Sequence, residues 1–254
     1  MDDAVAGAIG GLPGVATRVY GPGDRLLPDH LHGLLVIRDG AIALRVSAGR
    51  AVPTIVEILG PDWLLSARHW HGAPGTQNLD ATALIQTTML EVPTDALDRH
   101  LASSPHLAVT LARSMVEQQL ASLDHLAMLA MRDPFRRVAH ALLLLPERFP
   151  HPAEPAGSAH LAVSQDLIAA FAGLSRQTSN RQLRRLVRSG VVMLRRQVVE
   201  LRDRAALCSI AAGRRPPARW PLTNVLSQAR RLRDGGLTRR GAALHSNCSV
   251  CAVL

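Results

Sequence analysis

Residues 163–186 constrain the fold of this chain more than any other stretch, because two short amphipathic patterns flank a single glycine there. Ser164 and Ser175 each stand directly before one of these patterns, and a serine hydroxyl can accept a hydrogen bond from the first turn of a helix. Gly173 can adopt the positive φ angle that a tight turn between two helices requires. The stretch therefore predicts a helix-turn-helix.

The second helix of this motif carries the side-chain types that read DNA. Arginine forms a bidentate pair with guanine, and glutamine does the same with adenine. Because such helices touch base edges near their N-terminus, we predict that Arg176, Gln177 and Arg181 contact bases. Two β runs in residues 191–201 enclose a basic turn and predict a wing. The predicted phosphate contacts from the motif and the wing are Ser164, Ser175, Thr178, Ser179, Arg195 and Arg196.

Charge is distributed unevenly along the 254 residues, whose formal net charge is +9. Residues 1–160 carry 12 arginines against 16 acidic residues, whereas residues 161–207 carry 9 against 3 and residues 208–254 carry 8 against 1. A basic carboxy-terminal part favours a partner with a phosphate backbone, so double-stranded DNA is the expected partner. The alternative is a basic helix that is merely solvated on a helical bundle.

Residues 18–92 contain short β runs separated by turn residues, which predicts a small antiparallel sandwich or barrel. The clearest local signal is Asp39-Gly40, which lies between two apolar runs and predicts a β-hairpin. Residues 1–16 are small and glycine-rich, with little to bury.

A long helix is predicted from about Pro105 to beyond Met131. One stripe repeats at heptad spacing and predicts a dimer seam formed by Val109, Val116, Leu120, Leu123, Ala127 and Ala130. A second stripe of Leu111, Met115 and Leu126 is expected to face the sandwich. The alternative is that the seam is buried within one subunit.

These patterns divide the α+β chain into a β-rich domain at 15–100, a long helix at 101–132 that is predicted to dimerise, a winged helix-turn-helix at 133–207 and a basic, disordered tail at 208–254. No apolar run is long enough to span a membrane, and the first residues lack the positive charge of a signal peptide. We therefore expect a soluble, cytoplasmic protein without a membrane partner.

Taken together, the β-rich front, the long helix and the segment SQDLIAAFAGLSRQTSNRQLRRLVRSGVV resemble the CRP/FNR superfamily of bacterial transcription regulators over about residues 15–207. The turns VYGPGD, VIRDGAI and ILGPDWLL carry the weaker, amino-terminal part of the resemblance. It implies a homodimer joined along the long helix, a β-roll (jelly-roll) sensor domain at 15–100 like that of cyclic-nucleotide-binding proteins, and a winged helix on a twofold-symmetric operator. It also implies RNA polymerase as a partner if the protein is an activator.

The signal is not specified by the sequence. Members that bind cyclic AMP carry a Gly-Glu and a later Arg, but the corresponding stretches here are residues 63–66 and 76–80, which lack them. We therefore do not expect cyclic AMP to bind, because its phosphate would lack a guanidinium partner. No Cys precedes Cys208, which excludes an N-terminal iron–sulfur cluster. A heme-based gas or redox sensor ligated by His69 or His71 is the alternative, and binding of no cofactor at all also stays open.

A second class of function is a ligand-binding protein or an enzyme whose helical back half only supports the structure. The sequence contains no nucleophile elbow, phosphate-binding loop or spaced metal quartet, so an enzyme has no residues to carry its chemistry. We therefore predict a regulator that is not an enzyme.

Overall fold

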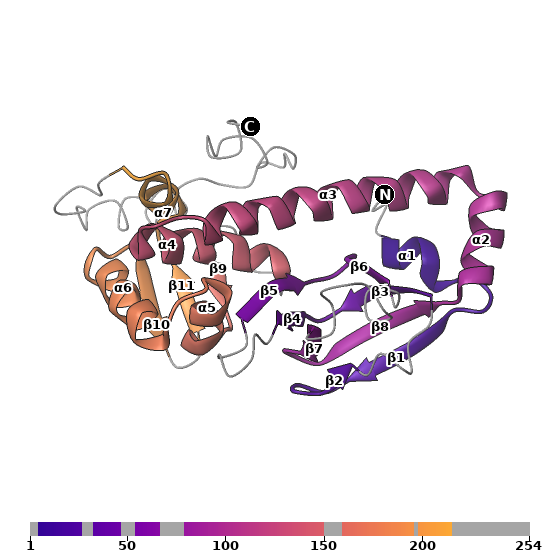
Figure 1. Ribbon diagram of the computed structural model, residues 1–254, viewed down its shortest axis with the longest axis horizontal. Helices are drawn as coiled ribbons and strands as arrows, with labels where there is room; N and C mark the ends of the chain where they lie inside the picture. The colour runs from indigo at the N-terminus through magenta and orange to yellow at the C-terminus, as the bar shows by residue number, and fades with distance from the viewer. Residues whose placement is uncertain are drawn as a thin grey trace, which may run out of the picture.

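The computed structural model describes residues 5–26, 33–46, 54–66, 79–149, 159–195 and 198–214. A β-rich amino-terminal half and a mainly helical carboxy-terminal half lie along one side of a long helix (Figure 1). This arrangement confirms the predicted α+β fold.

The amino-terminal half is a sandwich of two four-stranded antiparallel sheets with strand orders β1-β8-β3-β6 and β2-β7-β4-β5. The strands are β1 (Ala16–Tyr20), β2 (Arg25–Leu26), β3 (Leu34–Asp39), β4 (Ile42–Val46), β5 (Thr54–Leu59), β6 (Leu64–Ser66), β7 (Leu79–Ala83) and β8 (Thr87–Val92). Because most connections pass from one sheet to the other, the topology is the expected jelly roll. Apolar side chains from both sheets, including Leu35, Ile42 and Met89, fill the space between them.

The predicted hairpin at Asp39-Gly40 is wrong. β3 pairs with β6 and β8, whereas β4 pairs with β5 and β7, so the Asp-Gly pair turns the chain from one sheet into the other. The flanking residues explain this outcome, because Ile37, Ala41 and Ile42 are all fully buried and none faces solvent as in a two-stranded ribbon.

Residues 1–16 also depart from their prediction. Helix α1 (Val5–Gly10) buries Val5 and Ile9 against the outer face of the first sheet and the long helix. The amide of Ala6 donates a 2.8 Å hydrogen bond to the carboxylate of Asp62, which fixes the start of the helix. The small residues of this segment allow close packing, and its partner surface comes from distant parts of the sequence.

Two helices follow the sandwich, α2 (Thr94–Ser103) and the long α3 (Pro105–Leu129). Ser104 separates them, and its hydroxyl accepts a hydrogen bond from the amide of Leu107. Leu111 is buried as expected, but Met115 and Leu126 are 61% and 58% exposed, so their predicted contact with the sandwich is wrong. These two side chains widen the exposed apolar stripe instead.

The carboxy-terminal half contains α4 (Pro134–Leu144), the 3₁₀ helix η3 (Leu145–Arg148), α5 (Gln165–Phe171), α6 (Arg176–Arg188) and α7 (Arg204–Ala211). Its sheet has the order β10-β11-β9, with β9 (Ala159–Leu161), β10 (Val192–Arg195) and β11 (Val198–Leu201). The sequence did not predict β9 or α7. Because α7 is a continuous helix that packs on α4, the predicted start of the tail at residue 208 is wrong.

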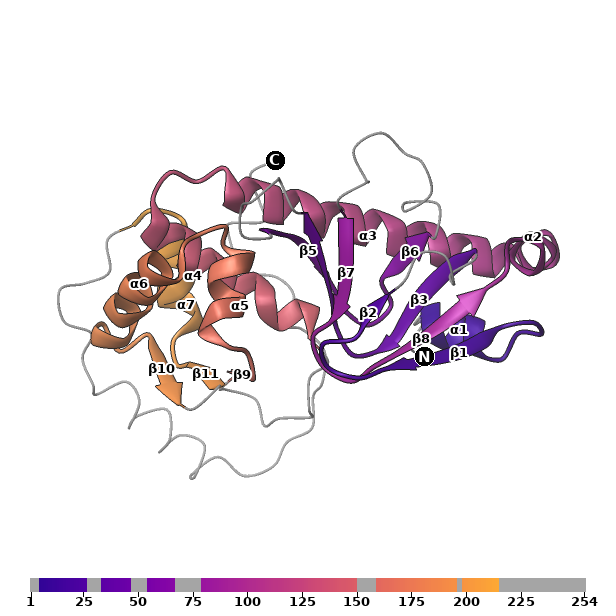
Figure 2. The same cartoon turned by 60° about the horizontal axis from the view of Figure 1, so that its bottom comes forward.

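The two halves share a hydrophobic core. Ile55 and Ile58 of β5 belong to the same buried cluster as Phe171 of α5 and Leu142 of α4. Figure 2 shows α5 facing the end of the sandwich at β5, with α3 running past both. Of the helices in the described ranges, none has the length and hydropathy needed to cross a membrane.

Candidate nucleic-acid interface

The helix-turn-helix forms where the sequence predicts it. Residues 172–175 join α5 to α6, and Gly173 has a φ angle of 60°, as the turn requires. The amide of Leu174 donates a 2.9 Å hydrogen bond to the carbonyl of Ala169, which closes the turn. A Cβ atom on residue 173 would lie 3.0 Å from the end of the Leu129 side chain of α3, which would have to shift by a few tenths of an ångström.

Both predicted serine caps are present. The Ser164 hydroxyl accepts a 3.1 Å hydrogen bond from the amide of Leu167 at the start of α5. The Ser175 hydroxyl accepts from the amide of Thr178 at 3.2 Å and donates to the Thr178 hydroxyl at 2.9 Å. These bonds fix the residue at which α6 begins, and therefore the direction of its first exposed side chains.

We expect the substitution Ser175→Ala to lower the free energy of unfolding by about 1 kcal/mol, because an amide of the first turn of α6 loses its acceptor. Urea denaturation of the purified protein measures this change. Ser175→Asn keeps a side-chain oxygen at the cap and is the matched control. Equal losses in the two variants would show that the cap hydrogen bond does not stabilise α6.

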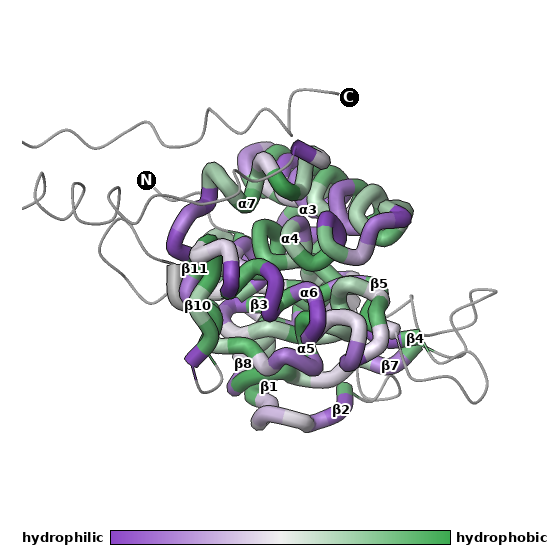
Figure 3. The backbone as a smooth tube through the Cα atoms, turned by 90° about the vertical axis from the view of Figure 1, so that its left-hand side faces the viewer, coloured by the Kyte–Doolittle hydropathy of each residue, from purple (hydrophilic) through white to green (hydrophobic). Residues whose placement is uncertain are grey.

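Helix α6 has a buried face and a polar face. Leu183 and Leu186 are fully buried against the rest of the carboxy-terminal half, and Gln182 is buried beside them. Arg176, Gln177, Arg181, Arg184 and Arg188 are exposed. Figure 3, which views this end of the molecule, shows hydrophilic stretches along α6.

Ser179 does not lie on the polar face, and its predicted phosphate contact is wrong. The residue has no exposed surface, and its hydroxyl makes no hydrogen bond within the described part of the chain. It precedes Leu183 by one helical turn and Leu186 by two, so it shares their buried face. Serine is small and polar and can lie on either face of a helix, so its residue type does not show whether it is buried or exposed.

The three predicted base readers project from the N-terminal half of α6, but their surroundings differ. The guanidinium of Arg176 lies 2.8 Å from the carboxylate of Asp166 on α5, in an ion pair that is largely exposed. Arg181 forms no ion pair with another described residue. Asp166 therefore restricts the directions that Arg176 can take, whereas Arg181 is available to a ligand.

The wing is formed by β10 and β11, which pair in antiparallel register from Val192 with Leu201 to Arg195 with Val198. Arg195 is exposed, and its Nε lies 3.7 Å from the carboxylate of Glu200. Arg196 lies outside the described residues. The wing thus places one of its two predicted phosphate contacts at its tip.

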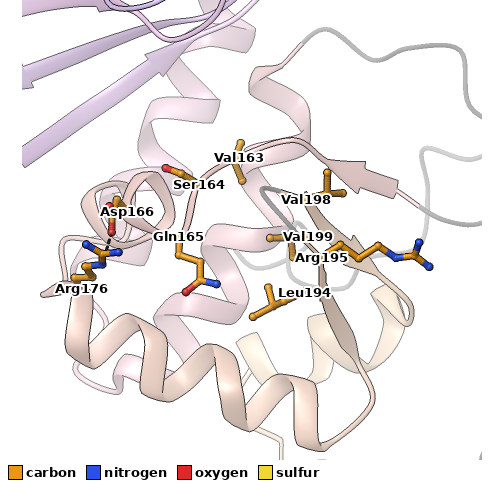
Figure 4. Close-up of a pocket in the computed structure, with 9 residues that line it drawn as sticks. All are labelled: Val163, Ser164, Gln165, Asp166, Arg176, Leu194, Arg195, Val198 and Val199. Carbon is orange, nitrogen blue, oxygen red and sulfur yellow. Dashed lines mark ion pairs between the residues drawn. The ribbon is translucent and has the colours of Figure 1, made fainter.

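A hollow of about 250 Å³ separates the wing from the start of the two motif helices. Figure 4 shows Gln165 projecting into this hollow, with Arg176 and Asp166 on one side and Leu194 and Arg195 on the other. Sequence reasoning missed Gln165 as part of this surface. Its position directly after the Ser164 cap, at the start of the first motif helix, was the available signal.

The predicted cofactor ligands receive no test from the structure. His69 and His71 lie outside the described residues, as does most of the later segment at 76–80. Over the ranges that are described, no group of three or more His, Cys, Asp or Glu side chains is placed to hold a metal ion.

Comparisons with known proteins agree with this geometry. Residues 136–210 match the family described as the Crp-like helix-turn-helix domain. The transcriptional activator protein anr of Pseudomonas aeruginosa is 28% identical over 138 residues, which are 54% of this chain and 57% of that protein. The CRP-like cAMP-activated global transcriptional regulator of Mycobacterium tuberculosis is 26% identical over 182 residues, which are 72% of this chain and 77% of that protein. The chain thus spans little more than half the length of the first of these relatives.

Among solved structures, a CRP/FNR-family transcriptional regulator from Thermus thermophilus superimposes with a TM-score of 0.63 at 20% sequence identity. The match covers 79% of this chain and 100% of that one. The two chains therefore share their fold over most of this chain and the whole of the other.

Proposed function

We propose that this chain, which belongs to the CRP/FNR superfamily of bacterial transcription regulators, binds double-stranded DNA as a homodimer and regulates transcription. The observation that carries the proposal is the exposed polar face of α6, which a capped and tightly turned motif holds in place. In this proposal α6 enters the major groove and the wing contacts the adjacent backbone.

The exposed side chains of α6 match the chemistry of base edges. Arg181 can donate two parallel hydrogen bonds to O6 and N7 of guanine, and Gln177 can pair with N6 and N7 of adenine. Members of the superfamily often have Glu at the position of Gln177, and a glutamine there shifts the preference from cytosine towards adenine. Ser164, Ser175, Thr178 and Arg195 contribute phosphate contacts that set the register.

Dimerisation is proposed through α3. Val109, Val116, Leu120 and Leu123 are between 42% and 58% exposed, although all four are apolar. Ala127 and Ala130 continue this seam towards the carboxy-terminal half, and they are exposed as well. A continuous apolar stripe of this kind on one chain favours an interface with a second copy. Two copies would place their α6 helices at half-sites about 34 Å apart.

The proposal is tested by measuring the DNA affinity of the Arg181→Ala variant. The control is Arg188→Ala, which removes the same charge at the C-terminal end of α6. We expect Arg181→Ala to weaken binding of the preferred sequence by about tenfold to a hundredfold, and to remove discrimination at one base pair of each half-site. Arg188→Ala should weaken binding to all DNA sequences by the same factor. Fluorescence anisotropy with labelled duplexes at fixed salt measures both effects.

Two results would contradict the proposal. One is a sequence preference that survives Arg181→Ala unchanged, which would mean that α6 does not read bases. The other is an affinity for duplex DNA that is independent of salt concentration, because neutralisation of phosphates must release counterions.

The signal that controls the regulator is proposed to be something other than cyclic AMP. The Mycobacterium tuberculosis relative is named as cAMP-activated. In this chain the segment that would hold the ribose and phosphate is Trp63 followed by the apolar start of β6. Calorimetric titration of the purified protein with cyclic AMP is expected to show no binding, and saturable binding would refute this part of the proposal.

A further inference from the structure

A single histidine lies where the helix-turn-helix meets the sandwich. His125 projects from α3 into the contact between β5 and α5, and it has no exposed surface. Its two ring nitrogens lie 3.0 Å from backbone oxygens of these two elements. The side chain therefore contacts the sandwich, the long helix and the DNA-binding half at once.

Both ring nitrogens of His125 face carbonyl oxygens. Nδ1 lies 3.0 Å from the carbonyl oxygen of Val56 on β5, and Nε2 lies 3.0 Å from the carbonyl oxygen of Phe171 on α5. A carbonyl oxygen can only accept, so each of these nitrogens must carry a proton to make its hydrogen bond. A neutral imidazole has one N–H group and would leave one of the two contacts without a donor, whereas the imidazolium satisfies both.

The surroundings of the ring supply a counterion. The Glu57 carboxylate of β5 is buried and lies 3.7 Å from Nδ1 of His125. Phe171 stacks on the imidazole face with ring centroids 4.0 Å apart, and an aromatic face attracts a cation. A negative charge and an aromatic face thus lie against the ring in a site that water does not reach.

The same carboxylate also binds a buried arginine. Nε of Arg148 lies 3.4 Å from Glu57, and its Nη2 donates a 2.9 Å hydrogen bond to the carbonyl of Ala121 on α3. Two further titratable groups lie near His125, Asp124 on α3 and His140 on α4. The charged and titratable groups around the two histidines are thus the carboxylates of Glu57 and Asp124 and the guanidinium groups of Arg148 and Arg136.

We propose that His125 is a proton-operated latch between the sensor sandwich and the DNA-binding half. In the imidazolium form it holds α5 against β5 through both carbonyls. Loss of the proton removes one of the two hydrogen bonds and leaves Glu57 with Arg148 and the Ile58 amide as partners, so α5 is released more readily from β5. Because the docked conformation binds a proton that the released one gives up, docking is favoured as the pH falls and weakens as the pH rises.

His140 is expected to have the opposite effect on how stability depends on pH, so the contributions of the two histidines can be distinguished. Burial lowers the pKa of His140, with a smaller opposing effect from Asp124. Its neutral form is therefore preferred in the folded protein, and protonation below its usual pKa destabilises the fold. A gain of docking at lower pH consequently cannot come from His140.

The first experiment is nitrogen-15 NMR of ring-labelled histidine in the intact, DNA-free protein at about pH 7. The signals of His125 are assigned by their loss in His125→Gln. We expect both ring nitrogens of His125 to have the chemical shift of a protonated nitrogen. An unprotonated shift at either nitrogen of the unaltered protein would overturn the proposal.

The second experiment measures docking directly. Spin labels are placed at two exposed positions, Thr54 on β5 and Arg188 on α6, in a chain without its native cysteines, and labelled protomers are diluted with unlabelled chain. Distances are recorded at about pH 6 and about pH 9, on either side of the range in which histidine titrates. We expect the population with the longer distance between the two labels to grow at high pH. The ratio of released to docked molecules should change by up to about tenfold per pH unit.

His125→Gln should abolish this pH dependence, and the matched control His140→Gln should retain it. A distance distribution that is the same at both pH values, or a His125→Gln variant that responds like the unaltered chain, would refute the latch. A pH-dependent DNA affinity would follow only if the proposed function also holds. Because both experiments are carried out without DNA, a failure of the latch can be told apart from a failure of DNA recognition.

Discussion

The double substitution of Leu120→Glu and Leu123→Glu is expected to produce a monomer that binds its operator about a hundredfold to ten thousandfold more weakly than the unaltered protein. The two side chains are 58% and 42% exposed on α3, within the apolar stripe that we propose as the dimer seam. Two carboxylates from each chain would meet there without partners, and burial of unpaired charges is strongly unfavourable.

The loss of affinity follows because the two α6 helices of a dimer are linked to each other. In a dimer, binding of the first α6 holds the second close to its own half-site, so the second event is intramolecular. Such linkage contributes a factor of about 10² to 10⁴ in overall affinity without any new contact. Sedimentation equilibrium measures the oligomeric state, and anisotropy with a two-half-site duplex measures the affinity.

Arg99→Glu is the matched control for this prediction. It makes the same change in net charge at a position on α2 that is 70% exposed and lies outside the stripe. We expect this variant to stay dimeric, with only the modest loss of affinity that added negative charge causes. If the double variant on α3 stays dimeric, or if both variants lose affinity equally, the proposed seam is not the interface.

The parts of the fold that the sequence predicted well are those whose signals are local. Ser164, Gly173 and Ser175 lie within 12 residues of one another, and each acts on the backbone next to it. The caps and the turn therefore formed as predicted. The heptad stripe on α3 could also be identified from the sequence, because residues on one face of a helix recur at a fixed spacing whatever the helix contacts.

The parts that were missed depend on partners that are distant in the sequence. Ile9 is fully buried because α3 and β8 cover it, and no pattern within residues 1–16 indicates those partners. Ser179 was assigned to the wrong face of α6 because its small hydroxyl is compatible with either face. The cluster of Glu57, His125 and Arg148 has no spacing rule at all, since its members come from three separate elements.

Gly40→Ala is the prediction that tests the corrected jelly-roll corner, and we expect it to lower the free energy of unfolding by about 3 kcal/mol or more. Gly40 has a φ angle of 104°, a conformation that strains any residue with a side chain. A Cβ atom there would also lie 2.5 Å from the Cα of Thr87 and 2.7 Å from the carbonyl oxygen of Gln86. Both of those atoms belong to the backbone, so β8 would have to move away from the corner.

Gly23→Ala separates the cost of backbone strain from the cost of the contact with β8. Gly23 has a φ angle of 89°, but a Cβ atom there would meet nothing within 4 Å. It therefore reports the backbone strain alone, which is about 1 to 3 kcal/mol. Urea denaturation of both variants gives the difference due to the contact with β8. A flat hairpin at Asp39-Gly40, as the sequence suggested, would place no strand behind the glycine and would make the two substitutions equally costly. A clearly larger loss for Gly40→Ala thus requires that the chain cross between sheets at this residue, directly against β8.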